Sequence, residues 1–178
     1  MSAKVVQENL GDAVISAIVQ FARKDIKTVA QIEDVLDHIS NANKRYVIAL
    51  AIYGARWIYK LQLVTLTSNE EQIAHVRAQI SEYGSSCEAI LLNMACDDGF
   101  KYSGIPKFYH VIRYCKSKRI INASLSNKLH TLRMWRNEIH MEIRTSPKYL
   151  DYSKQAYSIL QEVIIQTRRW KSVPIKTL

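Results

Sequence analysis

Glycine and proline are scarce in this 178-residue chain, which contains 5 Gly and 3 Pro. These numbers are too small for the many tight turns of a β-sandwich or a β-barrel. Helix-forming Ala, Leu, Glu, Gln, Lys and Arg instead recur in long stretches without breakers. The sequence therefore predicts an all-α fold with one well-buried core, or at most two small helical units.

Cysteine and histidine are also few, and their spacing fits none of the common metal sites. The three cysteines, Cys87, Cys96 and Cys115, are scattered and odd in number, so they form neither a disulfide framework nor a Cys-x-x-Cys metal knuckle. None of the 5 histidines stands in a His-Glu-x-x-His or Cys/His arrangement. We therefore expect no metal and no cofactor.

Long hydrophobic stretches are absent as well. The most apolar run, residues 46–59, is interrupted by Arg56 and followed by Lys60, whereas a bilayer span needs roughly 20 apolar residues. Residues 1–21 carry Glu8 and Asp12 and lack the layout of a signal peptide. These features predict a cytoplasmic protein that does not enter a membrane.

Acidic residues are scarcest toward the C-terminal end of the chain, whose overall net charge is +9. Residues 101–178 hold 16 Lys/Arg against 4 Asp/Glu, a net charge of +12, whereas residues 1–70 carry +1 and residues 71–100 carry −4. A basic surface on this scale commonly serves a polyanion, most often nucleic acid. The alternatives are a solubilising face or a binding site for an acidic partner protein.

Apolar spacing and breaker positions predict helices over most of the chain. We expect them at about residues 5–24, 28–39, 44–64, 69–96, 106–117, 124–144 and 151–170, with a basic tail that begins at Arg168. In the helix at 69–96, apolar side chains alternate at steps of 3 and 4, at Ile73, Val76, Ile80, Tyr83, Cys87, Ile90 and Met94. Such a stripe packs along a partner helix, in the chain's own core or in a dimer, and core packing is the simpler interpretation.

The most unusual segment spans residues 132–140. On an ideal helix Arg133, Arg136, Asn137 and His140 share one face, and Arg144 continues it. Metal-free RNA cleavage needs such groups, because an imidazole can take the 2′-hydroxyl proton near neutral pH and an Arg fork can stabilise the charge that develops on the phosphate. An amide can orient the imidazole or donate to phosphate.

A structural interpretation of the same groups stands beside the catalytic one. The arginines and the histidine could instead bind helix carbonyls or the side chains of Glu138 and Glu142.

At this segment the sequence resembles the HEPN superfamily, helical domains whose ribonuclease members carry an Arg-x(4–6)-His motif late in the bundle. Arg133 and His140 enclose six residues, at the long end of that range. The family often has Asn directly after the Arg; Arg136-Asn137 supplies that pair, but only three residues separate Arg136 from His140. Which arginine is the counterpart stays open. The likeness covers about residues 70–170 and includes the segments 87–92, 108–115, 120–121, 129–133 and 151–170.

The resemblance implies a HEPN-like helical bundle at residues 70–178, preceded by a helical extension at residues 1–69. It implies a metal-independent endoribonuclease of the toxin–antitoxin or anti-phage defence type, with Arg133, Arg136, Asn137 and His140 as catalytic residues. It also implies a homodimer whose two motifs face one cleft, and a partner protein such as an antitoxin or a defence subunit. The alternative function is a catalytically degenerate adaptor that binds RNA or an acidic partner protein.

Residues 108–119 mix aromatic and basic side chains, as proteins that bind single-stranded nucleic acid do. Phe108 has the spacing of a core residue, whereas Tyr109 and the cations are placed to face solvent. The RNA contacts that we expect are Arg113, Lys116, Lys118, Arg119 and Arg144.

Overall fold

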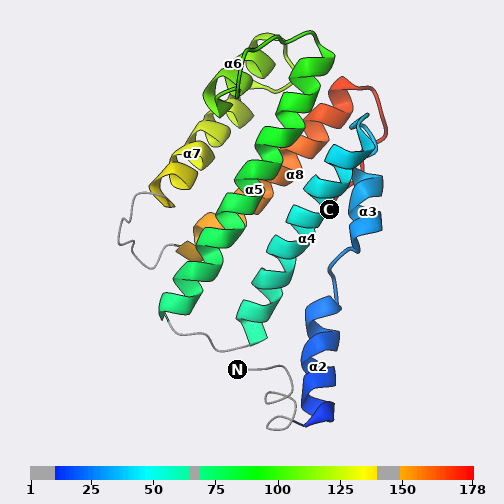
Figure 1. The fold of residues 1–178 in the computed structure, drawn as a ribbon, viewed down its shortest axis with the longest axis vertical. Helices are drawn as coiled ribbons and strands as arrows, with labels where there is room; N and C mark the ends of the chain where they lie inside the picture. Colours follow the sequence, from blue (N-terminus) through cyan, green and yellow to red (C-terminus); the bar gives the residue numbers. More distant parts are fainter. Residues whose placement is uncertain (1–10, 65–68, 140–148) are drawn as a thin grey trace.

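The computed structural model describes residues 11–64, 69–139 and 149–178. Within these ranges it contains seven α-helices and no strand, which confirms the all-α prediction. The helices are α2 (Asp12–Arg23), α3 (Val29–Val35), α4 (Ala42–Val64), α5 (Asn69–Asp97), α6 (Phe108–Ser117), α7 (Ala123–Ile139) and α8 (Tyr149–Trp170) (Figure 1).

The helix predicted at 5–24 is interrupted at Gly11, whose φ of +70° is not helical, so α2 begins at Asp12. Two further predicted helices are shorter than expected. The helix predicted at 28–39 ends at Val35, because Leu36 leaves the helical conformation and caps it. The helix predicted to start at residue 106 begins at Phe108, because Lys107 has an extended backbone and forms the N-cap. The predicted starts and ends at residues 5–10 and 140–144 lie outside the described residues.

Side-chain caps fix the start of several helices, among them α3 and α7. The Thr28 hydroxyl accepts a hydrogen bond from the Gln31 amide, and the Gln31 side chain accepts one from the Thr28 amide, which together form a capping box. Asn122 starts α7 in a similar way, because its side-chain oxygen accepts a hydrogen bond from the Leu125 amide at 2.8 Å. Asn122 therefore sets the direction in which α7 leaves the preceding turn.

Helix α5 crosses the middle of the molecule and packs against α4, α6, α7 and α8 (Figure 1). Six of the seven residues in its predicted apolar stripe are buried, and Ile73 is half-buried. The stripe therefore lies in the chain's own core. α5 also buries residues beside the stripe, among them Leu91 and Ala95, because it has neighbours on several sides.

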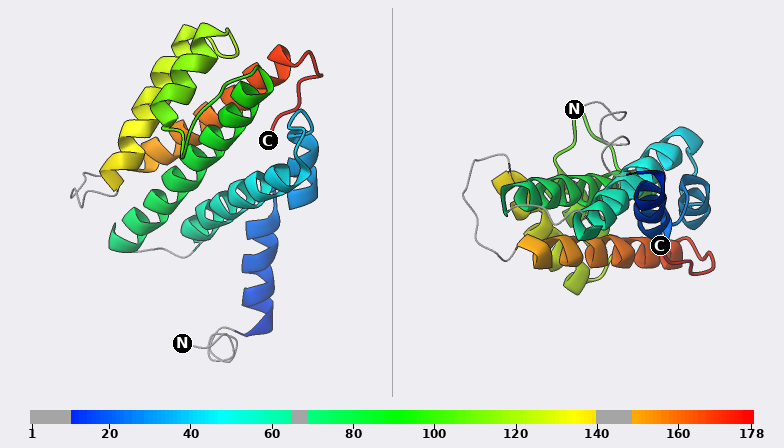
Figure 2. Two further views of the ribbon diagram at one scale, coloured as in Figure 1. Left: turned by 45° about the horizontal axis from the view of Figure 1, so that its top comes forward. Right: turned by 90° about the horizontal axis from the view of Figure 1, so that it is seen from below.

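The core includes side chains from α3 to α8, for example Ile32, Ile52, Ile80 and Leu160. Helices α3 and α4 thus contribute to the same core as α5 and α8. Helix α2 contacts α4 and extends away from the other helices (Figure 2). The predicted division of the chain between residues 69 and 70 remains a prediction.

The start of the predicted basic tail is built into the fold. The side chain of Arg168 is fully buried and donates hydrogen bonds to the Val35 carbonyl oxygen at 2.5 Å, the Pro174 carbonyl oxygen at 2.6 Å and Asp37 Oδ1 at 2.6 Å. Lys176 forms ion pairs with Asp34 at 2.7 Å and with Asp37 at 3.0 Å. These contacts hold the segment after α8 against α3, so Arg168 adds no exposed charge.

Candidate nucleic-acid interface

Helices α6 and α7 pack against each other and bring aromatic and cationic side chains together around Tyr109. Tyr109 is 39% exposed, and the guanidinium carbons of Arg113 and Arg133 lie 5.6 Å and 5.7 Å from the centroid of its ring. The His130 ring centroid lies 5.4 Å from that of Tyr109. Two guanidinium groups, an imidazole and a partly exposed aromatic ring therefore share one face. This combination can bind phosphates and unstacked bases.

The described part of the structure contains no ion pair for Arg113 or Arg133. Arg133 Nε is also buried without a hydrogen-bond partner among the described residues. A guanidinium that has no carboxylate partner can bind phosphate without first giving up an ion pair.

Arg136 is placed differently from Arg133. Its guanidinium is ion-paired with Glu88 of α5, and both side chains are about three-quarters buried. Gly84, one turn before Glu88, permits this approach, because a Cβ at Gly84 would stand 3.3 Å from Arg136 Cδ. Glycine lowers the helix propensity of α5 at this position, and its missing side chain leaves the space that Arg136 occupies.

A pocket of ≈ 460 Å³ lies beside this face and contains three of the four predicted catalytic residues, Arg133, Arg136 and Asn137. Glu88, Tyr109 and residues 105–108 also line it. Asn137 is exposed, so its amide can reach a ligand in this pocket. The fourth predicted catalytic residue, His140, lies outside the described residues, three positions after Asn137.

His130 is a residue that the sequence analysis did not select. Burial lowers the pKa of His130, and the positive charges of Arg133 and Lys116 lower it further. The imidazole is therefore neutral near pH 7 and can accept a proton or a hydrogen bond. The signal was present in the sequence, because His130, Arg133 and Asn137 stand at helical spacings of 3 and 4.

The predicted RNA contacts separate into three groups. Arg113 lies beside Tyr109, while Lys116 and Arg119 line a second pocket. Lys118 forms an ion pair with Asp98 at 3.4 Å, with its amine 5.6 Å from the Tyr114 ring centroid, so it is partly neutralised. Arg144 lies outside the described residues.

Other chemistries find little support in the described residues. They contain no group of three or more His, Cys, Asp or Glu side chains placed to hold a metal ion. Burial raises the pKa of Cys115 to about 12, so this thiol stays protonated at neutral pH and is a poor nucleophile. Among the described helices, none has the length and apolar character that a bilayer span requires.

Comparison of the chain with models of protein families, with curated proteins and with solved structures found no match.

Proposed function

We propose that this protein is a metal-independent endoribonuclease that binds RNA along α6 and α7. The observation that carries the proposal is the cluster around Tyr109, where Arg113 and Arg133 have no carboxylate partner among the described residues. It lies within the segment whose net charge is +12 and includes Arg133, the first residue of the Arg-to-His spacing that resembles the HEPN motif.

In this proposal Arg133 is the phosphate clamp and His140 is the base. His140 takes the proton of the ribose 2′-hydroxyl, whose oxygen attacks the adjacent phosphorus. The bond from phosphorus to the 5′-oxygen of the next nucleotide breaks, this oxygen takes a proton from water, and His140 returns its own proton to the solvent. Arg133 stabilises the charge that develops on the phosphate oxygens. Asn137 orients the imidazole or donates to the same phosphate. The products are a 2′,3′-cyclic phosphate and a 5′-hydroxyl.

The resemblance to the HEPN superfamily adds the biological part of the proposal. Members of that superfamily commonly act as homodimers, so we propose a dimer in which two copies of the motif face one cleft. We also propose a cytoplasmic toxin or anti-phage role, with an antitoxin or a defence subunit as the partner protein.

A second function, a non-catalytic adaptor that binds RNA or an acidic partner protein, is favoured by one specific contact. The ion pair between Arg136 and Glu88 neutralises one of the two candidate arginines, as expected for a structural role. If Arg136 were the only phosphate clamp, the site would be inactive.

Incubation of wild-type protein with structured RNA, in the presence of EDTA, tests the proposal. We expect cleavage to continue in EDTA and the new 3′ ends to carry a cyclic phosphate. RNA affinity measured alongside should fall steeply with salt. A plot of the logarithm of the binding constant against the logarithm of the salt concentration should have a slope of about −0.7 for each phosphate contacted on a single strand. Salt-sensitive binding without cleavage, alone and with the natural partner, would favour the adaptor, whereas an affinity that does not change with salt would reject both RNA functions.

A further inference from the structure

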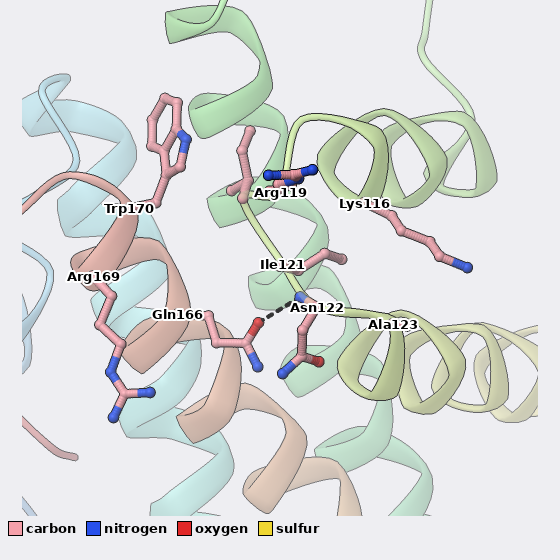
Figure 3. A pocket seen from close by; sticks show the side chains of 9 residues that line it. Lys116, Arg119, Ile121, Asn122, Ala123, Gln166, Arg169 and Trp170 are labelled. Atoms are coloured by element: carbon pink, nitrogen blue, oxygen red, sulfur yellow. Dashed lines mark hydrogen bonds between the residues drawn. The ribbon is translucent and has the colours of Figure 1, made fainter.

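A second pocket, of ≈ 520 Å³, lies where the turn after α6 meets the end of α8 (Figure 3). Lys116 and Arg119 extend from α6 and its turn, and Arg169 and Trp170 extend from the last turn of α8. The described lining residues include no carboxylate. Lys116, Arg119 and Arg169 are exposed, and none of them forms an ion pair within the described part of the chain.

The walls of this pocket are held in place by a hydrogen bond and an ion pair that join the start of α7 to α8. The Asn122 amide donates to Gln166 Oε1 at 2.8 Å (Figure 3). Within α8, Gln166 Nε2 donates to Glu162 Oε1 at 3.1 Å. Lys128 forms an ion pair with Glu162 at 2.7 Å. The nearby carboxylate is therefore neutralised, and the positive charge of the pocket is not offset by it.

Arg119 occupies a backbone position that favours glycine. Its φ angle is +56°, in the left-handed region, where it ends α6 with a hydrogen bond from the Ile120 amide to the Cys115 carbonyl oxygen at 2.9 Å. A side chain other than glycine in this conformation costs about 1 kcal/mol. An arginine at such a position is consistent with a use for its guanidinium that offsets this cost.

We propose that this pocket binds a short stretch of an RNA strand, with one phosphate at Arg119, another at Arg169 and one base against the half-buried indole of Trp170. The inference rests on the proposed RNA function and names a binding subsite for it. Proteins commonly bind unstacked nucleotides with aromatic side chains beside cations, because every base has a face that can stack on an aromatic ring. Lys116, whose charge acts on His130, lies between this pocket and the Tyr109 cluster. The same side chains could bind a free nucleotide, so the experiment distinguishes an RNA strand from a free nucleotide.

The first arm measures affinity for a fluorescent single-stranded RNA at several salt concentrations. We expect Arg119→Gly and Arg169→Gln each to weaken binding by about tenfold and to reduce the salt slope by about 0.7. Arg23→Gln removes a guanidinium from the exposed end of α2 and is the matched control, with unchanged affinity. Arg119→Gly should keep or raise the melting temperature, because glycine fits the left-handed backbone, so weaker binding could not be attributed to unfolding.

The second arm uses Trp170. Trp170→Leu should weaken RNA binding by at least about fivefold, whereas Trp170→Phe keeps an aromatic ring and should retain most of the affinity. RNA should quench tryptophan fluorescence in the wild type, and much of this quenching should be lost in Trp170→Phe. Adenosine monophosphate is titrated in parallel. Tight binding of the nucleotide that RNA cannot displace would overturn the assignment to an RNA strand.

Failure of the subsite and failure of the proposed function give different results. If Arg119→Gly and Arg169→Gln bind RNA like the wild type while Arg133→Gln binds weakly, the subsite is wrong and the proposed RNA function stands. If the wild type binds no RNA but binds adenosine monophosphate through Arg119 and Arg169, the proposed function fails and the pocket belongs to a free nucleotide.

Discussion

Arg136 of α7 forms an ion pair with Glu88 of α5, 48 residues earlier in the chain. The neighbouring candidate, Arg133, instead lies over Tyr109 and has no ion pair within the described residues. The sequence leaves open which arginine binds phosphate. The ion pair with Glu88 favours Arg133, because Arg136 would have to leave its carboxylate partner in order to bind a phosphate.

Substitution of the two arginines should therefore have different consequences. We expect Arg133→Gln to lower RNA affinity and cleavage strongly with little loss of stability. Arg136→Gln should cost about 1 kcal/mol of folding stability through loss of its partly buried ion pair. Thermal melting and RNA binding of both variants check this. Equal loss of affinity in the two variants would contradict the separation of roles.

Removal of the Glu88 charge should raise RNA affinity, whereas removal of the Arg133 charge should lower it. Glu88→Gln deletes a negative charge beside the pocket and releases the Arg136 guanidinium. RNA should bind more tightly than to the wild type, by a few-fold at low salt and less at high salt, because salt screens the added attraction. Glu82→Gln removes the same charge elsewhere on α5 and serves as the control. Weaker binding by Glu88→Gln would mean that the ion pair positions the site.

The stability of the fold should depend on Arg168. Arg168→Met keeps most of the side-chain volume but leaves the Val35 and Pro174 carbonyl oxygens without their donor. We expect a loss of about 3 kcal/mol, measured as a lower urea midpoint. The adjacent Arg169 is exposed, so Arg169→Met should change stability by less than about 0.5 kcal/mol. Equal midpoints for the two variants would contradict the anchoring role of Arg168.

Acid should destabilise the fold through His38. Its Nε2 lies 3.0 Å from the Thr167 hydroxyl, and burial, followed by the charge of Arg168, lowers the pKa of His38 from 6.5 to about 4. Between these values the unfolded chain binds a proton that the folded chain does not, so stability is present above pH 6.5 and is lost as the pH falls toward 4.

Urea unfolding at two pH values measures this effect. We expect His38 to account for a loss of roughly 2 kcal/mol between pH 7 and pH 5. His38→Gln can still donate to Thr167 but does not titrate, so its stability should change less over the same range. A wild type and a His38→Gln variant with the same pH dependence would assign the acid sensitivity to other groups.

Local patterns predicted the helices and the common face of α7 because helical periodicity is a local property. Contacts between distant residues were not predictable in this way. The Arg136–Glu88 ion pair, the Arg168–Val35 hydrogen bond and the pocket between α6 and α8 join segments 48, 133 and about 50 residues apart. Arg168 shows the consequence most clearly, because the charge pattern assigned it to a basic tail and the packing of α3 against α8 buries it.

The measurement that tests the proposed nuclease most directly is a cleavage time course in EDTA with the wild type, His140→Ala and Arg133→Gln. Folding is checked by thermal melting and RNA binding by anisotropy, and His75→Ala is the control for loss of an imidazole elsewhere. We expect His140→Ala to bind RNA nearly as well as the wild type but to cleave about 10²–10⁴-fold more slowly, as loss of a general base usually does. Cleavage by His140→Ala at the wild-type rate would contradict the proposed site.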